Sequence, residues 1–185
     1  MEFSFASRPH PAELVCGDLV AVTQGRDALV AAVIDGLGHG PEANKAALAA
    51  QQAVLREGPL SPAALLYKCH DAMKATRGAA MSILRLQQGG RGAFPGVGNV
   101  ALHVRARQPI SAISIPGIVG HRMRKVQEFA FAFRPGDLFC LASDGIVSAL
   151  SLEGVDASRL HAEAERIVAS FGRPNDDATA LLVVG

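Results

Sequence analysis

The spacing of hydrophobic residues in the first half of the chain changes from a strand-like to a helix-like period. Two β-like runs, at 13–24 and 27–35, are separated by a short polar turn. Apolar residues then recur at helical spacing over 43–57, just after a proline that is typical of a first helical turn. Ser61 precedes a second proline and predicts the cap of another helix, which ends near Thr76.

The second half of the chain returns to strand-like patterns and contains one more helix. β-like runs cover 79–87 and 93–106, with a glycine-rich turn between them. The segment 129–145 contains two further runs, and its Arg-Pro-Gly-Asp sequence predicts a hairpin-like turn between them. A helix is predicted over 158–171 and a closing strand over 179–185.

The order of these elements predicts an α+β fold. Antiparallel sheets covered by helices fit this order better than a regularly alternating parallel sheet does. The sequence contains no internal repeat and no linker long enough to separate two domains, and its 185 residues suffice for a sizeable core. We therefore expect a single domain over residues 1–185.

Composition and charge exclude several classes of partner. Lys and Arg number 18 against 17 Asp and Glu, so the formal net charge of +1 provides no general field for nucleic acid or an anionic membrane. No apolar segment approaches the ~20 residues that span a bilayer. The three cysteines have neither metal-ligand nor redox spacing and predict reduced thiols in a cytoplasmic protein. No nucleic-acid or membrane partner is expected, and a monomer is the default expectation.

One local basic run, at 121–125, stands out from this balanced charge. It is more typical of a solvated loop than of a docking patch. It closes the stretch 108–125, which mixes glycine, proline and basic residues, and we expect this stretch to carry specificity for the substrate.

Acidic residues recur at the edges of apolar runs, next to a glycine, a small residue or a turn. They are Asp18, Asp35, Asp144 and the adjacent pair Asp176 and Asp177. A single Asp-Gly after a strand is usually only a turn. Several carboxylates brought close to a core are costly unless a cation compensates their charge. The set therefore predicts a cation site.

The chemistry of these ligands narrows the identity of the cation. Carboxylates, backbone carbonyls and water suit Mg²⁺ or Mn²⁺. No cluster of cysteine and histidine accompanies the aspartates, which argues against a thiolate zinc site. Two such ions ~3.5–4 Å apart can share a carboxylate and activate a water for attack on a phosphoryl or acyl centre. Gly36, next to Asp35, would let its carbonyl or a hydrated ion approach the backbone closely.

The motifs that contain these residues resemble a known family. "GD" at 17–18, "DGLGHG" at 35–40, "PGDLFCLASDG" at 135–145 and "NDDAT" at 175–179 follow the order and spacing of the metal-dependent Ser/Thr protein phosphatases of the PPM class, in the SpoIIE/RsbU/RsbX branch. The resemblance covers nearly the whole chain. It implies an αββα sandwich, with two antiparallel β-sheets flanked by helices, and a centre of two Mn²⁺ or Mg²⁺ ions.

The resemblance also implies metal ligands among these residues. Asp35 would bridge the two ions and take part in catalysis, and Gly36 would offer its backbone carbonyl. Asp144 and Asp176 would hold one ion, whereas Asp18 would complete the other, directly or through water.

Three further residues have less direct roles under the same resemblance. Asp177 is the alternative ligand within its doublet, or it supports the ligand without binding the ion itself. His39 either donates a proton to the leaving alkoxide or orients a ligand through a hydrogen bond, and the second role is favoured. Arg8 is the only early candidate for the arginine with which some members of the class bind phosphate.

The implied reaction is hydrolysis of phosphoserine or phosphothreonine by metal-activated water, without a phosphoenzyme. Because the motifs begin near the start of the chain, the sequence resembles the stand-alone RsbX type. Phosphatases of this type act on phosphorylated STAS-domain proteins of the stressosome in partner-switching stress signalling. One alternative is an RsbU- or SpoIIE-like phosphatase of an anti-anti-sigma factor. Another is a non-catalytic module that binds phosphoprotein. A nucleotide-binding loop is excluded, because the G-x-G-x-x-G order is lacking.

Overall fold

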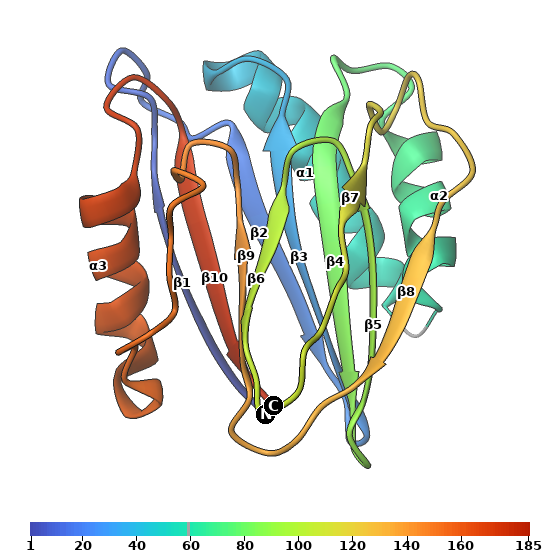
Figure 1. Ribbon diagram of the computed structural model, residues 1–185. Helices are drawn as coiled ribbons and strands as arrows, with labels where there is room; N and C mark the ends of the chain where they lie inside the picture. The colour runs from blue at the N-terminus through green and yellow to red at the C-terminus, as the bar shows by residue number, and fades with distance from the viewer. Residues whose placement is uncertain (59) are drawn as a thin grey trace.

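The computed structural model describes residues 1–58 and 60–185 and shows two β-sheets with helices outside them (Figure 1). The helices are α1 (Gly40–Glu57), α2 (Pro62–Ala72) and α3 (Leu160–Phe171), and a 3₁₀ turn at Ala157–Arg159 precedes α3. The strands are β1 (Glu2–Arg8), β2 (Asp18–Gln24), β3 (Ala28–Gly36), β4 (Ala79–Gln87), β5 (Arg91–Val97), β6 (Ala101–Arg105), β7 (Ser114–Ile115), β8 (Glu128–Ala132), β9 (Leu138–Ala142) and β10 (Ala178–Val184).

The two sheets are almost entirely antiparallel. One has the strand order β1-β10-β9-β6, and the other has the order β2-β3-β4-β5-β7, with β8 also paired to β5. Among the described strands, only the short pairing of β5 with β7 is parallel. The predicted sandwich of two antiparallel sheets flanked by helices is confirmed.

Three apolar clusters fill the spaces between the four layers. Helices α1 and α2 pack on the larger sheet around Ile34 and Leu65. The two sheets meet around Phe94 and Phe139. Helix α3 covers the outer face of the smaller sheet around Ile167. Because each sheet is covered on both faces, its central strands are apolar on both sides, as the continuous hydrophobic run of β3 reflects.

The N-terminal strand β1 is not among the elements that the sequence pattern predicted. It pairs with β10 along its whole length, at the edge of the smaller sheet. Phe3 and Phe5 on this strand remain exposed, so its pattern lacks a fully buried face. The strand predicted over 13–24 is shorter than expected, because β2 begins only at Asp18 and 9–17 forms a loop.

The segment 134–137 is a turn, as predicted, but it does not close a hairpin. β8 pairs with β5 in the larger sheet, whereas β9 lies between β10 and β6 in the smaller one. The Asp137 carboxylate fixes the turn by accepting hydrogen bonds from the N–H groups of Arg134 at 2.8 Å and Arg107 at 3.2 Å. Local turn chemistry thus predicted the turn correctly but not the strand partners on either side of it.

Helix α2 shows how local bonds set its ends. The Ser61 hydroxyl caps it by accepting a hydrogen bond from the Ala64 N–H at 3.3 Å. The helix ends at Ala72, earlier than predicted, because the N–H and the hydroxyl of Thr76 both donate to the carbonyl of Met73. No helix in the described part of the chain is long and apolar enough to cross a membrane.

Candidate metal centre

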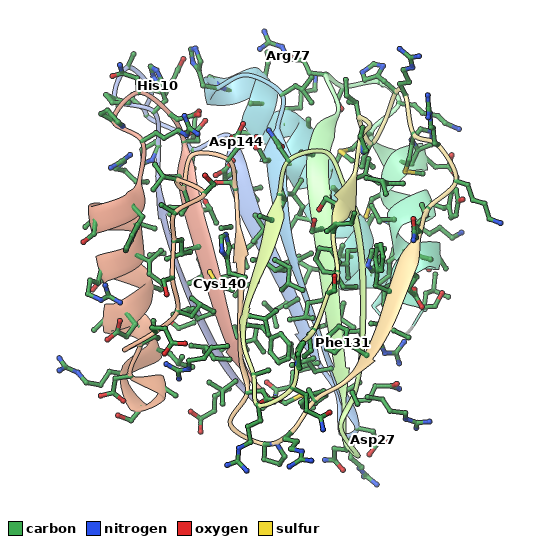
Figure 2. All side chains as sticks on the ribbon, viewed as in Figure 1. His10, Asp27, Arg77, Phe131, Cys140 and Asp144 are labelled. Carbon is green, nitrogen blue, oxygen red and sulfur yellow. The ribbon has the colours of Figure 1, made fainter. Side chains whose placement is uncertain are left out.

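One end of the sandwich gathers the aspartates that the sequence singled out. The antiparallel register of β2 and β3 places Asp18 directly opposite Asp35. Asp144 follows the end of β9, and Asp176 and Asp177 precede the start of β10, its neighbour in the sheet. Figure 2 shows Asp144 near this end of the molecule and Asp27 at the opposite end.

Three of these carboxylates face the same space. A hollow of about 210 Å³ is lined by Asp35, Asp144 and Asp176, and its other walls are Leu37, Gly38, His39, Ala80 and Asn99. Asp35 ends a buried strand, while Asp144 and Asp176 lie on loops. The sequence therefore brings acidic groups together from three separate chain segments.

The other two aspartates are more buried than these three. Asp18 and Asp177 are both buried, and neither lines the hollow. One oxygen of Asp177 accepts a hydrogen bond from the His10 N–H at 2.9 Å, but its other oxygen, Oδ2, is buried without a partner, as is Oδ2 of Asp18. Gly17 accommodates this arrangement, because a Cβ there would lie 2.7 Å from the unpartnered Asp177 oxygen.

The electrostatic cost of this grouping is visible in the pKa values of its members. Burial raises the pKa of Asp18 from 3.8 to about 7, although hydrogen bonds from Ser143 and Thr179 oppose the shift. Burial, followed by the charges of Asp18 and Asp144, holds the pKa of Asp35 well above its usual range. Ionised carboxylates this close are costly in a poorly solvated site, and a bound cation would remove that cost.

Asp176 is affected in the same direction. Its pKa is raised by burial first and then by the charge of Asp144, while Arg173 acts in the opposite sense. Two carboxylates of the hollow therefore resist ionisation in the absence of a positive charge between them.

The donor set fits a hard divalent ion. The site supplies carboxylate oxygens, of which Oδ2 of Asp18 is buried without a partner, and such oxygens suit Mg²⁺ and Mn²⁺. Within residues 1–58 and 60–185, no group of three or more Asp, Glu, His or Cys side chains is gathered as the ligands of one ion. This is compatible with Mg²⁺, which typically uses one or two carboxylates and keeps several waters.

Gly36 has a packing role that the sequence interpretation did not include. A Cβ at this position would lie 2.1 Å from the carbonyl oxygen of Ala43, inside helix α1. The glycine therefore lets the end of β3 pass directly against the helix. The expectation that it frees the backbone for an ion stays a prediction.

Asn99 and Arg173 hold Asp144 and were not predicted as site residues. Asn99 Nδ2 donates a hydrogen bond to Asp144 Oδ2 at 2.5 Å, and Arg173 Nε donates to the Asp144 carbonyl at 2.9 Å. A signal for Asn99 existed in the sequence, since Gly98-Asn99-Val100 interrupts the predicted strand 93–106. Nothing local in the sequence indicates that Arg173 reaches Asp144.

His39 belongs to a second unpredicted cluster at the rim of the hollow. Its Nδ1 lies 2.7 Å from Glu13 Oε1, and its ring stacks on that of His10 with 4.3 Å between the ring centroids. Gly40 has a φ of 72°, a conformation that favours glycine, and a Cβ there would lie 2.4 to 2.7 Å from the Glu13 carboxyl group and displace it. Glu13 lies at the start of the predicted strand 13–24 and His10 in no motif, so the sequence does not predict their contact with His39.

The arginine beside the Gly38 wall of the hollow is not the one that the sequence indicated. Arg8, the early candidate for phosphate binding, does not line the hollow; its guanidinium donates to the carbonyl of Arg173. Arg77 is instead the arginine next to the loop that contains Gly38, since a Cβ on Gly38 would lie 3.0 Å from Arg77 Nη1. Figure 2 shows Arg77 at the same end of the molecule as His10 and Asp144.

Comparison with known sequences identifies one related phosphatase. No family model matches the chain. The chain is 29% identical over 135 residues to phosphoserine phosphatase RsbX of Bacillus subtilis (strain 168), and the match covers 71% of this chain and 68% of that protein.

Solved structures share the whole fold. A chain from a structure described as "The bacterial stressosome: a modular system that has been adapted to control secondary messenger signaling" has a TM-score of 0.92 and 29% identity, and covers 98% of this chain and 97% of its own. RsbX in complex with magnesium gives a TM-score of 0.84 with 23% identity, over 97% and 92%. The catalytic domain of the serine/threonine phosphatase PstP with two manganese ions gives 0.69 with 16% identity, over 98% and 96%.

Proposed function

We propose that the chain hydrolyses phosphoserine or phosphothreonine on STAS-domain proteins of the stressosome. The premise is that the sequence match and the shared fold support a phosphatase of the PPM class and of the RsbX type. The observation that carries the proposal is the convergence of Asp35, Asp144 and Asp176 on one hollow. Convergent acidic groups with raised pKa values are typical of a functional site.

The proposed cofactor is a pair of Mn²⁺ or Mg²⁺ ions. Relatives of the same fold are described with magnesium and with two manganese ions, which supports this choice. Asp35 and the Gly36 carbonyl would hold the ions together with Asp144 and Asp176, and Asp18 would act directly or through water. When bound, such ions polarise a phosphoryl oxygen and lower the pKa of water.

Asp177 is proposed as a support for the site rather than as a ligand. It is buried, it lies outside the lining of the hollow, and one of its oxygens is engaged by the His10 N–H. Asp176 lines the hollow and is partly exposed. This difference supports Asp176 as the direct ligand of the doublet.

The remaining groups around the hollow would orient the substrate and move a proton. Arg77 would contact the phosphoryl oxygens, because its guanidinium lies at the Gly38 loop and forms no ion pair among the described residues. Glu13 holds Nδ1 of His39, which leaves Nε2 of that ring available to donate a proton to the leaving serine or threonine oxygen.

Two other substrates or roles remain as alternatives for the same site. An anti-anti-sigma factor would present the same phosphoserine or phosphothreonine group, so a comparison of rates on the two kinds of STAS protein decides between them. A non-catalytic module that binds phosphoprotein is less well supported, because every aspartate of the motif set is present and three converge.

The cellular setting is part of the proposal. Cys16, Cys69 and Cys140 are all free thiols, which fits a reducing compartment such as the cytoplasm. We propose that residues 1–185 act as one domain and as a monomer, which size-exclusion chromatography with light scattering tests directly.

The deciding experiment is hydrolysis of a small aryl phosphate by the purified chain, with Mn²⁺ and with a chelator, beside the Asp35→Asn variant. Activity that needs Mn²⁺ and is lost in the variant supports the proposal. If the wild-type chain releases no phosphate from either the aryl phosphate or a phosphorylated STAS protein, the proposal is wrong and the binding module takes its place.

A further inference from the structure

The basic segment 116–125 lies against the metal hollow through Gly78. The carbonyl of Gly78 accepts a hydrogen bond at 3.0 Å from the N–H of Leu37, a residue that lines the hollow. On its other side, a Cβ at Gly78 would lie 2.6 Å from the Val119 carbonyl and 2.8 Å from the His121 ring. A residue with no side chain thus separates the hollow from the segment.

A second contact brings the same segment to another wall of the hollow. The Gly98 N–H donates to the carbonyl of Ile115 at 2.9 Å, and a Cβ at Gly98 would lie 3.4 Å from the carbonyl oxygen of Gly117. Asn99, the next residue, lines the metal hollow. The start of the basic segment therefore adjoins the side of the hollow that Asn99 forms.

The segment encloses a hollow of its own. This space of about 510 Å³ is lined by Pro116, Gly117, Ile118, Arg122 and Arg124. The turn that forms it is ordered by backbone bonds, because the Ile118 N–H donates to the Arg122 carbonyl at 2.9 Å. It is also attached to α2, where the Tyr67 hydroxyl accepts from the Val126 N–H at 3.3 Å.

The charges at this second hollow form no ion pair with any residue that the structure describes. Arg122, Arg124 and Lys125 are exposed, and no ion pair in residues 1–58 or 60–185 involves them. Lys74, by contrast, pairs with Asp71 at 2.6 Å. Two arginines therefore border a recess beside an acidic catalytic hollow and remain free to bind an anion.

From this arrangement we propose that the second hollow binds acidic side chains next to the phosphorylated residue of a protein substrate. The inference rests on the proposed phosphatase function and adds to it a preference for the sequence around the phosphoresidue. An arginine guanidinium matches a carboxylate in both geometry and charge. Positive charge on this segment also attracts an acidic substrate towards a site whose own side chains are negative.

An acidic polypeptide segment fits the observations better than nucleic acid or a membrane. The basic groups are few and local, and the chain as a whole has a net charge of only +1. The segment that lines the recess adjoins the site proposed for phosphoserine or phosphothreonine through Gly78 and Gly98, so a segment of the same substrate can reach both. The expectation that 121–125 is a solvated loop stays a prediction, and the proposal gives the run a specific role beside it.

The test uses two phosphopeptides that share one phosphoserine and differ only in their flanks, which carry Asp and Glu in one and Asn and Gln in the other. Wild-type protein with Mn²⁺ is expected to show a kcat/KM roughly tenfold higher for the acidic peptide, and about 0.5 M salt should reduce this ratio. The double variant Arg122→Ala/Arg124→Ala should bring the ratio close to one.

A matched control removes two exposed arginines at the opposite end of the sandwich. Arg26→Ala/Arg91→Ala lowers the net charge equally and should leave the ratio at the wild-type value. A wild-type ratio of one, or an equal fall in both double variants, would overturn the docking inference.

Binding measurements separate this inference from the proposed function. Fluorescence anisotropy of the two labelled peptides with Asp35→Asn, and with Asp35→Asn/Arg122→Ala/Arg124→Ala, reports docking without turnover. Preference for the acidic peptide that disappears with the arginines supports the inference even if no hydrolysis occurs. Equal affinities for the two peptides contradict it, whatever the activity.

Discussion

Glu13 Oε1 and His39 Nδ1 lie 2.7 Å apart, although the two residues are 26 positions apart in the chain. Glu13 belongs to the loop before β2, and His39 immediately precedes α1. The carboxylate fixes the ring from one side while His10 stacks on its face. This contact orients the ring at the rim of the hollow and leaves Nε2 as the nitrogen that is available for proton transfer.

We predict that His39→Ala lowers kcat on a phosphopeptide by about a hundredfold and changes KM little, as expected for the loss of a proton donor. Glu13→Gln should lower kcat by roughly tenfold, because a neutral amide orients the imidazole less firmly and does not stabilise its protonated form. The measurement is steady-state kinetics over a range of pH.

The double variant distinguishes positioning from an independent contribution. If Glu13 acts only through His39, Glu13→Gln/His39→Ala should be no slower than His39→Ala alone. Losses that multiply would show that Glu13 acts on the reaction by another route. A fall in Tm large enough to explain the loss of activity by unfolding would likewise point to a purely structural contact.

The aspartates could be found from the sequence because each carries a local signal. An acidic residue at the end of an apolar strand, beside glycine, is visible without a structure, as at Asp35 and Asp144. The order and spacing of the motifs then gave the resemblance to a family, and that resemblance implied the sandwich. The role of glycine in these motifs was harder to interpret, because Gly36 has to lack a side chain where helix α1 packs against it.

The rest of the site depends on tertiary contacts that have no local signature. His10, Glu13 and Arg77 each lie in segments of ordinary composition, and only the fold brings them to the hollow. Strand β1 was missed for a related reason, since an edge strand with one covered face has a weaker alternation than a central one.

Asp18 should make the metal-free protein less stable as the pH rises. Its pKa is raised in the folded state, from 3.8 to about 7, so the folded protein holds a proton that the unfolded chain releases at a lower pH. This group therefore stabilises the fold progressively as the pH falls from about 7 towards 4, and it is destabilising above pH 7.

Thermal unfolding with a chelator, between pH 5 and pH 8, measures this effect. We expect Asp18→Asn to raise the Tm at pH 8 by several degrees, on the order of 2–4 °C for each kcal/mol gained in a domain of this size. The control Asp27→Asn, at the opposite end of the molecule, should not. A lower Tm for metal-free Asp18→Asn would contradict the prediction.

The doublet at the start of β10 provides a test of ligand assignment. Asp176→Asn removes a charge from the lining of the hollow and should weaken Mn²⁺ binding by at least tenfold. Asp177→Asn retains an oxygen that can accept from the His10 N–H and should weaken binding less. Isothermal titration calorimetry measures both, and the reverse order would make Asp177 the ligand.

Arg77 should affect binding of the phosphoryl group. Arg77→Ala is expected to raise KM for an aryl phosphate by about fivefold to tenfold, whereas Arg77→Lys, with a compact charge but no planar fork, should recover part of the loss. Arg8→Ala is the matched comparison, because Arg8 bonds to the Arg173 carbonyl away from the hollow. A larger effect of Arg8→Ala on KM would restore the assignment made from sequence.

Gly36→Ala tests whether the glycine after Asp35 is there for packing. The added Cβ would lie 2.1 Å from the Ala43 carbonyl, so β3 or α1 has to shift, and we expect a loss of about 3 kcal/mol or more in the free energy of unfolding. Gly89→Ala is a suitable control. Gly89 has a positive φ of 86°, which Gly36 does not have, but no atom lies within 4 Å of an added Cβ there, so that change should cost only about 1 kcal/mol. Urea unfolding in the presence of a chelator separates the two explanations, because a requirement set by the ion alone would leave the metal-free stability of Gly36→Ala unchanged.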